Sequence, residues 1–315
     1  MTPLLRIGAR GSALSLRQTE QVRARIAALL SVEETALAIT AITTSGDKQQ
    51  EGRLIETGGK GLFTKELDEA LRDHRIDIAV HSLKDLPTRL PDDIALACVP
   101  ERDDPRDAFV SMKAATLADL PAGAVIGTAS LRRQAQTLFA RPDLKVVTFR
   151  GNVDTRLRKL EAGVADATFL ALAGLKRLGL EAHARSLFDP HEMPPAACQG
   201  ALAITTRADD EETRMTLAAL EDANARVEIE AERAFLEALD GSCRTPISAL
   251  SRLEGARLSF IGETLTPDGK QRWRRESETT LGADPIAAAR ALGQSLGHDI
   301  RDEAGDALMM ERPEK

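Results

Sequence analysis

Short apolar runs typical of β-strands alternate along this chain with segments of helical period, and the alternation restarts once. The first series holds LLRIG, LAITAITT, IDIAVHS and IALACV, and it ends near PERDDPRD at 100–107. The second holds AVIGTAS, LKVVTF and DATFLAL, each followed by a helical segment. Alternating strands and helices are typical of α/β sheets. The chain is therefore expected to contain two similar α/β units.

The pattern changes near residue 247. Three runs with strand-like alternation, ISALSRL, ARLSFIGETL and QRWRRESETT, precede an alanine-rich helical segment. This arrangement predicts a small α+β third domain. The acidic segment 209–240 before it has helical period, and we interpret it as solvated helix faces.

Composition narrows the class of protein. A length of 315 residues exceeds one typical domain, and 43% hydrophobic with 29% charged residues describes an ordinary globular chain. The net charge of −7 argues against a nucleic-acid partner, and no apolar run approaches a membrane span of about 18 residues. Three distant cysteines fit neither a disulfide framework nor a zinc site. We therefore expect a cytoplasmic protein without metal.

Two charged residues follow the strand-like run IDIAVHS. Lys84 and Asp85 come next, before Pro87, and in open α/β sheets ligands gather outside the carboxyl ends of the strands. The pair either lines a ligand site or forms a surface ion pair, and the pattern alone allows both. His81, in the same run, is expected to be a structural histidine because no metal-binding or catalytic spacing includes it.

Positive charge is concentrated between Gly127 and Lys159. This segment contains eight Lys or Arg residues and only two acidic residues, Asp143 and Asp154. Arg132 and Arg133 open a predicted helix with Ser130 as its N-cap, and helix N-termini and guanidinium groups both favour anions. A small polyanionic ligand is favoured over DNA, because base stacking needs aromatic residues and the chain has one Trp and no Tyr. A soluble basic surface is the alternative.

Two glycine-containing stretches present further candidates. TGGKGLF at 57–63 does not fit a phosphate-binding loop, because Leu54 replaces its first glycine and Gly61 follows the lysine. The stretch is therefore expected to be either a flexible loop that presents Lys60 or a plain glycine turn. In GARGSALSL, helix capping explains Ser12 but leaves Arg10 unexplained.

Cys243 stands apart from the other cysteines because Gly, Ser, Arg and Pro surround it in DGSCRTPISA. Cys98 lies in a strand-like run and is expected to be buried and inert. A thiol beside Arg244 is expected to have a lowered pKa and to be ready for alkylation, whereas no nearby histidine suggests a protease-type nucleophile. Cys243 is interpreted as an anchor.

Several of these motifs occur together and in order: GARGSALSLRQ, GGKGLFTKEL, DIAVHSLKDLP, ERDDPRDAFVS, IGTASLRRQ, RGNVDTRLRKL, AGLKRLG and GSCRTPI. In this the chain resembles the porphobilinogen deaminase (hydroxymethylbilane synthase) family. The resemblance implies two periplasmic-binding-protein-like α/β domains with an interdomain cleft, and a small α+β C-terminal domain. The implied ranges are 1–99 with 200–221, then 100–199, then 222–315 with the cysteine.

The resemblance also implies a function and roles. In this family a cysteine, here Cys243, is joined by a thioether to a dipyrromethane cofactor, onto which porphobilinogen is added stepwise with loss of ammonia in tetrapyrrole biosynthesis. Asp85 matches the catalytic aspartate. The implied cofactor-binding residues are Lys84, Ser130, Arg132 and Arg133, and the implied substrate-binding residues are Arg10, Ser12, Gln18, Lys60, Thr128, Arg150, Arg156, Arg177 and Gln199. A cytoplasmic monomeric transferase is expected.

One position departs from the family pattern. In PPAACQGAL, Cys198 stands where a glycine is expected, so a positive φ there would strain the cysteine and affect the placement of Gln199. Two rival functions remain at this stage. One is a bilobed small-anion-binding protein without catalysis, and the other is a thiol enzyme of the acyl-transfer type.

Overall fold

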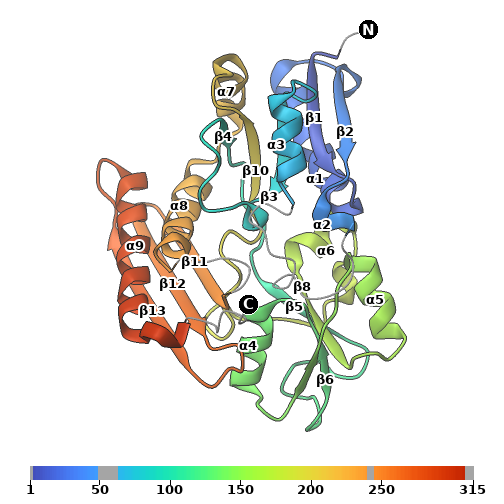
Figure 1. Cartoon of the computed structure of the whole chain (residues 1–315), viewed down its shortest axis with the longest axis vertical. Coiled ribbons are helices and arrows are strands. Elements are labelled where there is room, and N and C mark those ends of the chain that lie inside the picture. The colour runs from blue at the N-terminus through green and yellow to red at the C-terminus, as the bar shows by residue number, and fades with distance from the viewer. Residues whose placement is uncertain (1–2, 49–62, 240–244, 309–315) are drawn as a thin grey trace, which may run out of the picture.

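The computed structural model describes residues 3–48, 63–239 and 245–308 (Figure 1). The first unit is built on a five-stranded sheet in which β1 is parallel to β2 and β3, while β10 is antiparallel to β3 and β4. The strand order is β2 (Leu37–Ile42), β1 (Leu5–Arg10), β3 (Ile78–Ser82), β10 (Leu202–Arg207) and β4 (Ile94–Cys98). A strand from late in the chain thus lies between two early ones.

The second unit repeats this plan. In its five-stranded sheet β6 is parallel to β7 and β8, and β5 is antiparallel to β8 and β9. The strand order is β7 (Lys145–Val147), β6 (Val125–Gly127), β8 (Ala167–Ala171), β5 (Asp107–Ser111) and β9 (Ser186–Leu187). The prediction of two similar α/β units is confirmed.

Several helices of these two units begin at a residue whose side chain caps them. Ser12 accepts a hydrogen bond from Ser15 N at the start of α1, and Ser130 accepts one from Arg133 N at the start of α4, as predicted. Their bounds are α1 (Ala13–Leu30), α2 (Ser45–Lys48), α3 (Lys65–Arg72), α4 (Leu131–Ala140), α5 (Val153–Glu161), α6 (Leu172–Leu178) and α7 (Glu211–Leu217). Within the described ranges, no helix has the length and apolar character needed to cross a membrane.

The C-terminal part is the predicted α+β domain. Its antiparallel strands are β11 (Ile247–Glu254), β12 (Arg257–Leu265) and β13 (Arg272–Thr280), and α8 (Ala223–Ala238) and α9 (Pro285–Ala304) lie together beside them (Figure 1). Phe235 of α8 meets Phe260 of β12 with ring centroids 5.2 Å apart, in the core of this domain.

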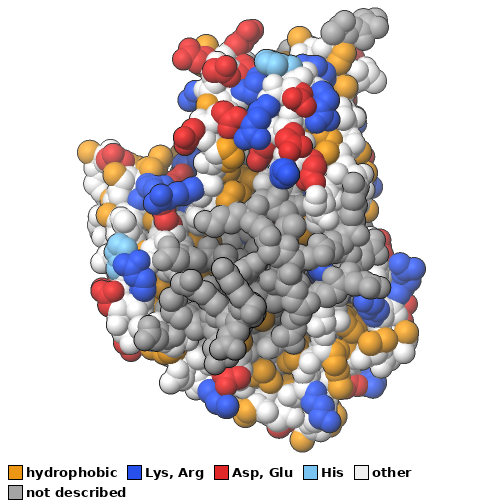
Figure 2. Space-filling view, in the orientation of Figure 1, with side chains coloured by type: hydrophobic (Ala, Val, Ile, Leu, Met, Phe, Trp, Pro, Cys, Tyr) orange, Lys and Arg blue, Asp and Glu red, His pale blue; other side chains and the backbone are white. Residues whose placement is uncertain are grey.

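The interpretation of segment 209–240 as solvated helix faces is wrong for α8. Acidic side chains gather on the surface at α7 (Figure 2), but Glu228 and Glu232 of α8 are buried. Both accept hydrogen bonds from Arg102, with Arg102 Nη1 at 2.7 Å from Glu232 Oε1. The sequence did not indicate this because Arg102 lies in a distant connection between the two units.

The two connections between the α/β units touch each other at Gly200. Asp103 N donates to Gly200 O, and a Cβ at Gly200 would lie 2.3 Å from Asp103 O. Gly200 also has a φ of +91°, so glycine is required there twice over. Two residues earlier, Cys198 has a φ of +63°. A cysteine therefore holds the left-handed conformation in which a glycine would be unstrained, and its N–H is fixed by Glu232 Oε2 at 2.5 Å.

Candidate active site

A pocket opens at the carboxyl ends of β1 and β3, and its lining includes Arg10, Ser12, Gln18, His81 and Asp85. Four of these were predicted site residues: Arg10, Ser12 and Gln18 are close together in the sequence, and Asp85 is distant from them. The parallel strands bring them together, because Arg10 ends β1 and Asp85 closes the short turn Leu83–Asp85 after β3. We call this site the Arg10 pocket.

Arg10 is the central cation of this pocket. Its Nη2 lies 2.5 Å from Asp47 Oδ1, its guanidinium stacks on the Phe63 ring at 4.1 Å, and its Nη1 lies 3.8 Å from Asp85 Oδ2. The Asp85 carboxylate is half-buried. Arg10 is thus shared between two carboxylates, with its strong bond going to Asp47 and only a long contact going to Asp85.

The wall of the pocket holds two buried polar side chains. Gln18 Nε2 donates to Ser82 Oγ at 2.9 Å, and His81 Nε2 lies 3.0 Å from Thr205 Oγ1 on β10. Burial and the charge of Arg10 lower the pKa of His81 to about 4. His81 is therefore neutral near neutral pH, and its place in the sheet is that of a structural histidine.

A second group of charges surrounds Asp107 at the start of β5, and we call Asp107, Arg132, Arg133, Gln199 and Lys84 the Asp107 cluster. Asp107 is completely buried, with Arg132 Nη1 at 2.8 Å and Arg133 Nη2 at 2.7 Å from its two oxygens. Burial alone would raise the pKa of Asp107, but the two arginines hold it well below its usual range. This carboxylate is permanently ionised and orients both guanidinium groups.

Gln199 joins Lys84 to this arrangement. Its Nε2 donates to Asp107 Oδ1 at 2.8 Å, and its Oε1 accepts from Lys84 Nζ at 3.0 Å. Lys84 is exposed to solvent, but the protein around its ammonium group and the charge of Arg133 lower its pKa to about 8. The predicted pair thus divides: Lys84 joins the Asp107 cluster, whereas Asp85 faces Arg10.

The composition of the Asp107 cluster fits a carboxylate-bearing cofactor. Two buried arginines share the Asp107 carboxylate, Lys84 joins them through Gln199, and Arg132 Nε is buried without a hydrogen-bond partner among the described residues. An uncompensated cation and an unpaired donor are both unfavourable when buried. Carboxylate oxygens of a bound group would satisfy both. No cluster of residues suited to a metal ion occurs in the described ranges.

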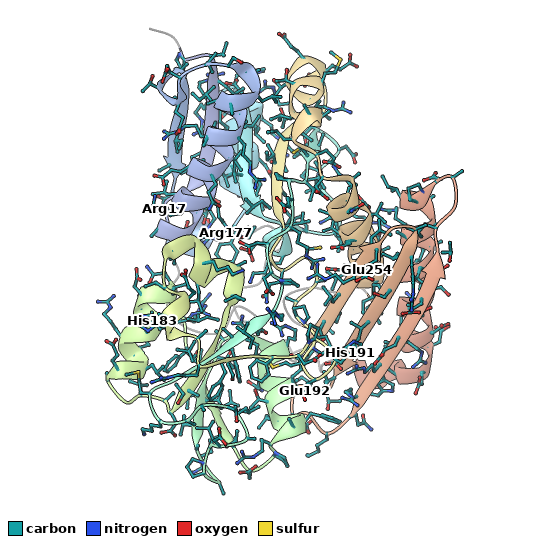
Figure 3. All side chains as sticks on the ribbon, turned by 180° about the vertical axis from the view of Figure 1, so that it is seen from behind. Arg17, Arg177, His183, His191, Glu192 and Glu254 are labelled. Carbon is teal, nitrogen blue, oxygen red and sulfur yellow. The ribbon has the colours of Figure 1, made fainter. Side chains whose placement is uncertain are left out.

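The remaining predicted residues differ in how close they lie to these two sites. Thr128 Oγ1 accepts from Ser130 N beside the cluster, and half-buried Arg156 has its pKa lowered to about 10 by burial and by the nearby Arg133 and Arg150. Arg177 on α6 lies apart from the pocket lining: it donates to Gly200 O at 2.9 Å and faces Asp103 (Figure 3). The anchor and loop predictions, Cys243 and Lys60, lie outside the described residues.

Sequence reasoning missed Asp107 and Asp47. Asp107 had a usable signal, since it opens the otherwise apolar run DAFVS, and a charge in a buried strand requires a partner. Asp47 had none, because it lies in the four-residue helix α2 and its partner in the pocket, Arg10, is far away in the sequence.

Comparison with known proteins assigns this arrangement to a family. Residues 5–215 match the family model described as porphobilinogen deaminase, dipyromethane cofactor binding domain, and residues 226–302 match the porphobilinogen deaminase C-terminal domain. The chain belongs to the porphobilinogen deaminase family. It is 56% identical to the porphobilinogen deaminase of Caulobacter vibrioides (strain NA1000 / CB15N), over 98% of both chains. It is 49% identical to that of Paracoccus denitrificans, over 95% of this chain and 94% of the relative.

Solved structures with a related arrangement share little sequence with this member of the porphobilinogen deaminase family. The methionine binding protein MetQ matches at a TM-score of 0.44 and 13% identity, over 70% of this chain and 91% of that one. A putative methionine-binding lipoprotein from Bacillus subtilis matches at 0.41 and 13%, over 70% and 92%. The Asp107 cluster and the Arg10 pocket both lie in the part of the chain that matches the cofactor binding domain of the family.

Proposed function

We propose that this enzyme is a transferase that condenses porphobilinogen stepwise, with release of ammonia, onto a dipyrromethane cofactor joined to Cys243. The product is the linear tetrapyrrole hydroxymethylbilane. The observation that carries the proposal is the Asp107 cluster, in which Arg132, Arg133 and Lys84 present more positive charge than Asp107 neutralises. Each pyrrole of porphobilinogen bears two carboxylates, so a dipyrrole supplies the missing negative charge.

The described neighbours of Cys243 support its role as the attachment point. Ser248, five residues further on, accepts a hydrogen bond from Gln136 Nε2, and Gln136 Oε1 accepts one from Arg132. Five extended residues span at most about 18 Å. The described end of this segment, at Ser248, is therefore linked to the Asp107 cluster through Gln136, which supports the proposal that Cys243 is the attachment point.

When bound, the dipyrromethane supplies the free pyrrole carbon that extends the chain. Lys84, Arg132 and Arg133 would bind its carboxylates, with Ser130 beside them. Asp85 would accept pyrrole N–H hydrogen bonds and balance the positive charge that develops as ammonia leaves the substrate. In its protonated form Asp85 could deliver the proton that the leaving amine takes up.

The incoming substrate would lie next to Asp85. There Arg10 makes a close ion pair with Asp47 and only a long contact with Asp85. The proposed substrate-binding residues remain those predicted from the sequence: Arg10, Ser12, Gln18, Lys60, Thr128, Arg150, Arg156, Arg177 and Gln199. Gln199 and Arg177 already bond to protein groups, so we propose that they act mainly by fixing their neighbours. We also propose a cytoplasmic monomer with the domain ranges 1–99 with 200–221, 100–199 and 222–315.

Intact-protein mass spectrometry tests the proposal. The purified chain should carry the additional mass of a dipyrrole, and Cys243→Ser should abolish it, because a hydroxyl is a far weaker nucleophile than a thiolate near neutral pH. Cys98→Ser is the matched control, since that thiol is buried and burial raises its pKa to about 12. A dipyrrole retained by Cys243→Ser would refute the attachment site. A parent chain without added mass would indicate the anion-binding alternative.

A further inference from the structure

The sheet of the C-terminal domain presents one row of polar side chains to α4. Ser248, Glu263 and Arg274 are direct cross-strand neighbours on β11, β12 and β13, so their side chains share a face. Gln136, on the second turn of α4, reaches this face. The row therefore connects the domain that contains Cys243 with the helix that begins at Arg132 and Arg133.

Gln136 has a defined orientation in this contact. Its Nε2 is surrounded by three acceptors, Glu263 Oε1 at 2.8 Å, Pro194 O at 2.9 Å and Ser248 Oγ at 3.2 Å. Its Oε1 must therefore point the other way, where it accepts from Arg132 Nη1 at 2.9 Å. The amide transmits the position of Glu263 to the guanidinium of Arg132.

Glu263 is an unusual residue for a packing role. It is only 2% exposed, and its Oε2 has no hydrogen-bond partner among the described residues. The cation paired with it is Arg274, whose Nη1 lies 3.7 Å from Glu263 Oε2, and Arg274 also donates hydrogen bonds to Glu276 and to the carbonyl of His191. A buried carboxylate with so little compensation is unfavourable, and an apolar side chain of similar volume would pack there more easily.

The charge of Glu263 acts on Arg132. Burial and the neighbouring Arg133 lower the pKa of Arg132, while Asp107 and Glu263 oppose this. Glu263 thus offsets part of the cost of burying the Arg132 guanidinium.

The rest of this contact is tight. A Cβ at Gly269, in the turn between β12 and β13, would lie 2.5 Å from Phe139 N of α4, and Gly269 has a φ of +71°. Gln134 Nε2 donates to Pro267 O at 3.1 Å, and Arg272 stacks on Phe139 at 4.3 Å. Helix α4 and the C-terminal sheet are therefore docked in a fixed register.

We propose that Glu263 is a positioning residue for the cofactor. Acting through Gln136, it orients the guanidinium of Arg132, which would bind the cofactor. The C-terminal domain, which would carry the attachment cysteine, would thereby also align an arginine that holds the attached group. This inference rests on the proposed function.

The test uses the isosteric variant Glu263→Gln and the matched control Glu278→Gln, which changes an exposed carboxylate on β13. The chains are produced without cofactor and incubated with porphobilinogen, and the gain of the dipyrrole mass is followed over time. Loading of Glu263→Gln should be slower by about five-fold, because the glutamine keeps a neutral hydrogen bond to Gln136 and loses only the contribution of the charge, and that of Glu278→Gln should be unchanged. The rise in Tm on loading should also be smaller in Glu263→Gln.

Equal loading rates, or an equal loss of Tm in the loaded and unloaded forms, would mean that Glu263 only supports the fold and would overturn the inference. If Glu263→Gln does not fold, Glu263→Asp serves in its place, because it keeps the charge but withdraws it from Gln136, and it should slow loading in the same direction. A parent chain that never gains the mass would instead overturn the proposed function, and this inference with it.

Discussion

The Asp107 cluster and the Arg10 pocket both place arginines beside carboxylates, but they do so in opposite ways. In the cluster, Arg132 and Arg133 are buried and bonded to both oxygens of one buried aspartate. In the pocket, Arg10 and Asp85 retain solvent exposure and lie 3.8 Å apart. A closed, fully ionised network suits a group that stays bound, whereas a loose pair beside water suits a substrate that enters and is replaced in each cycle.

This difference distinguishes the carboxylates that are already neutralised by the protein from the one that is not. The charges of the cluster are fixed by protein bonds before any ligand arrives, so little reorganisation remains for the reaction. Asp85 is the carboxylate of the comparison that is not already neutralised by a strong ion pair. This supports the proposal that Asp85 responds to a charge that develops during the reaction.

The largest effect that would test this comparison is expected from Asp85→Asn, which keeps the shape of the side chain but removes its charge. If Asp85 stabilises the developing cation, kcat should fall by about 10² or more, with a smaller change in KM. Ammonia release is measured on protein whose cofactor loading has been verified by mass. The control is Asp92→Asn, an exposed position after the same turn. Near-normal turnover by loaded Asp85→Asn would exclude this carboxylate as the catalytic group.

A smaller effect is expected from Arg156→Leu. Its guanidinium, with a pKa lowered to about 10, is still charged near neutrality and can bind a substrate carboxylate. Loss of one such contact, about 1.5–3 kcal/mol, should lower kcat/KM by roughly 10- to 100-fold. Arg158→Leu, at an exposed position on the same helix, should have little effect. Unchanged kcat/KM in Arg156→Leu, with an unchanged circular dichroism spectrum, would show that Arg156 only faces solvent.

The smallest effect concerns His81, which belongs to the wall of the pocket. Its pKa of about 4 in the folded chain lies below the ordinary value of 6.5, so the unfolded chain binds more protons between these values. The free energy of unfolding should therefore fall as the pH decreases from 6.5 toward 4, by at most about 1.4 kcal/mol per pH unit. Denaturant titrations should show a shallower fall for His81→Gln than for the parent chain. If the free energy of unfolding falls with the same slope in the parent chain and in His81→Gln, another group is responsible for the pH dependence.

The sequence allowed the repeated α/β plan to be predicted because it depends on local signals. The caps Ser12 and Ser130 and the periodic runs between them are readable without tertiary information. The burial of Glu228 and Glu232 could not be predicted from the sequence, because it depends on Arg102, more than a hundred residues away. Helical period alone cannot distinguish a solvated acidic face from one that meets a distant arginine.

The site shows the same limit. The excess of basic residues between 127 and 159 indicated an anion site, but Asp107, which orients two of them, enters from another strand. The division of Lys84 and Asp85 between two sites required their actual directions, since the pair lies in a tight turn after β3 and not in the strand. Pattern and resemblance named these residues, and tertiary structure assigned them to their neighbours.

The position of β10 in the first sheet has a consequence for biosynthesis on the ribosome. Strands β3 and β4 are both complete once Cys98 has been made, but the strand that separates them, β10, ends only at Arg207. At about 5–20 residues per second, the nascent first unit waits roughly 5–20 s with two open strand edges. The second unit, whose five strands lie entirely within that interval, is complete in the emerging chain before the first can close.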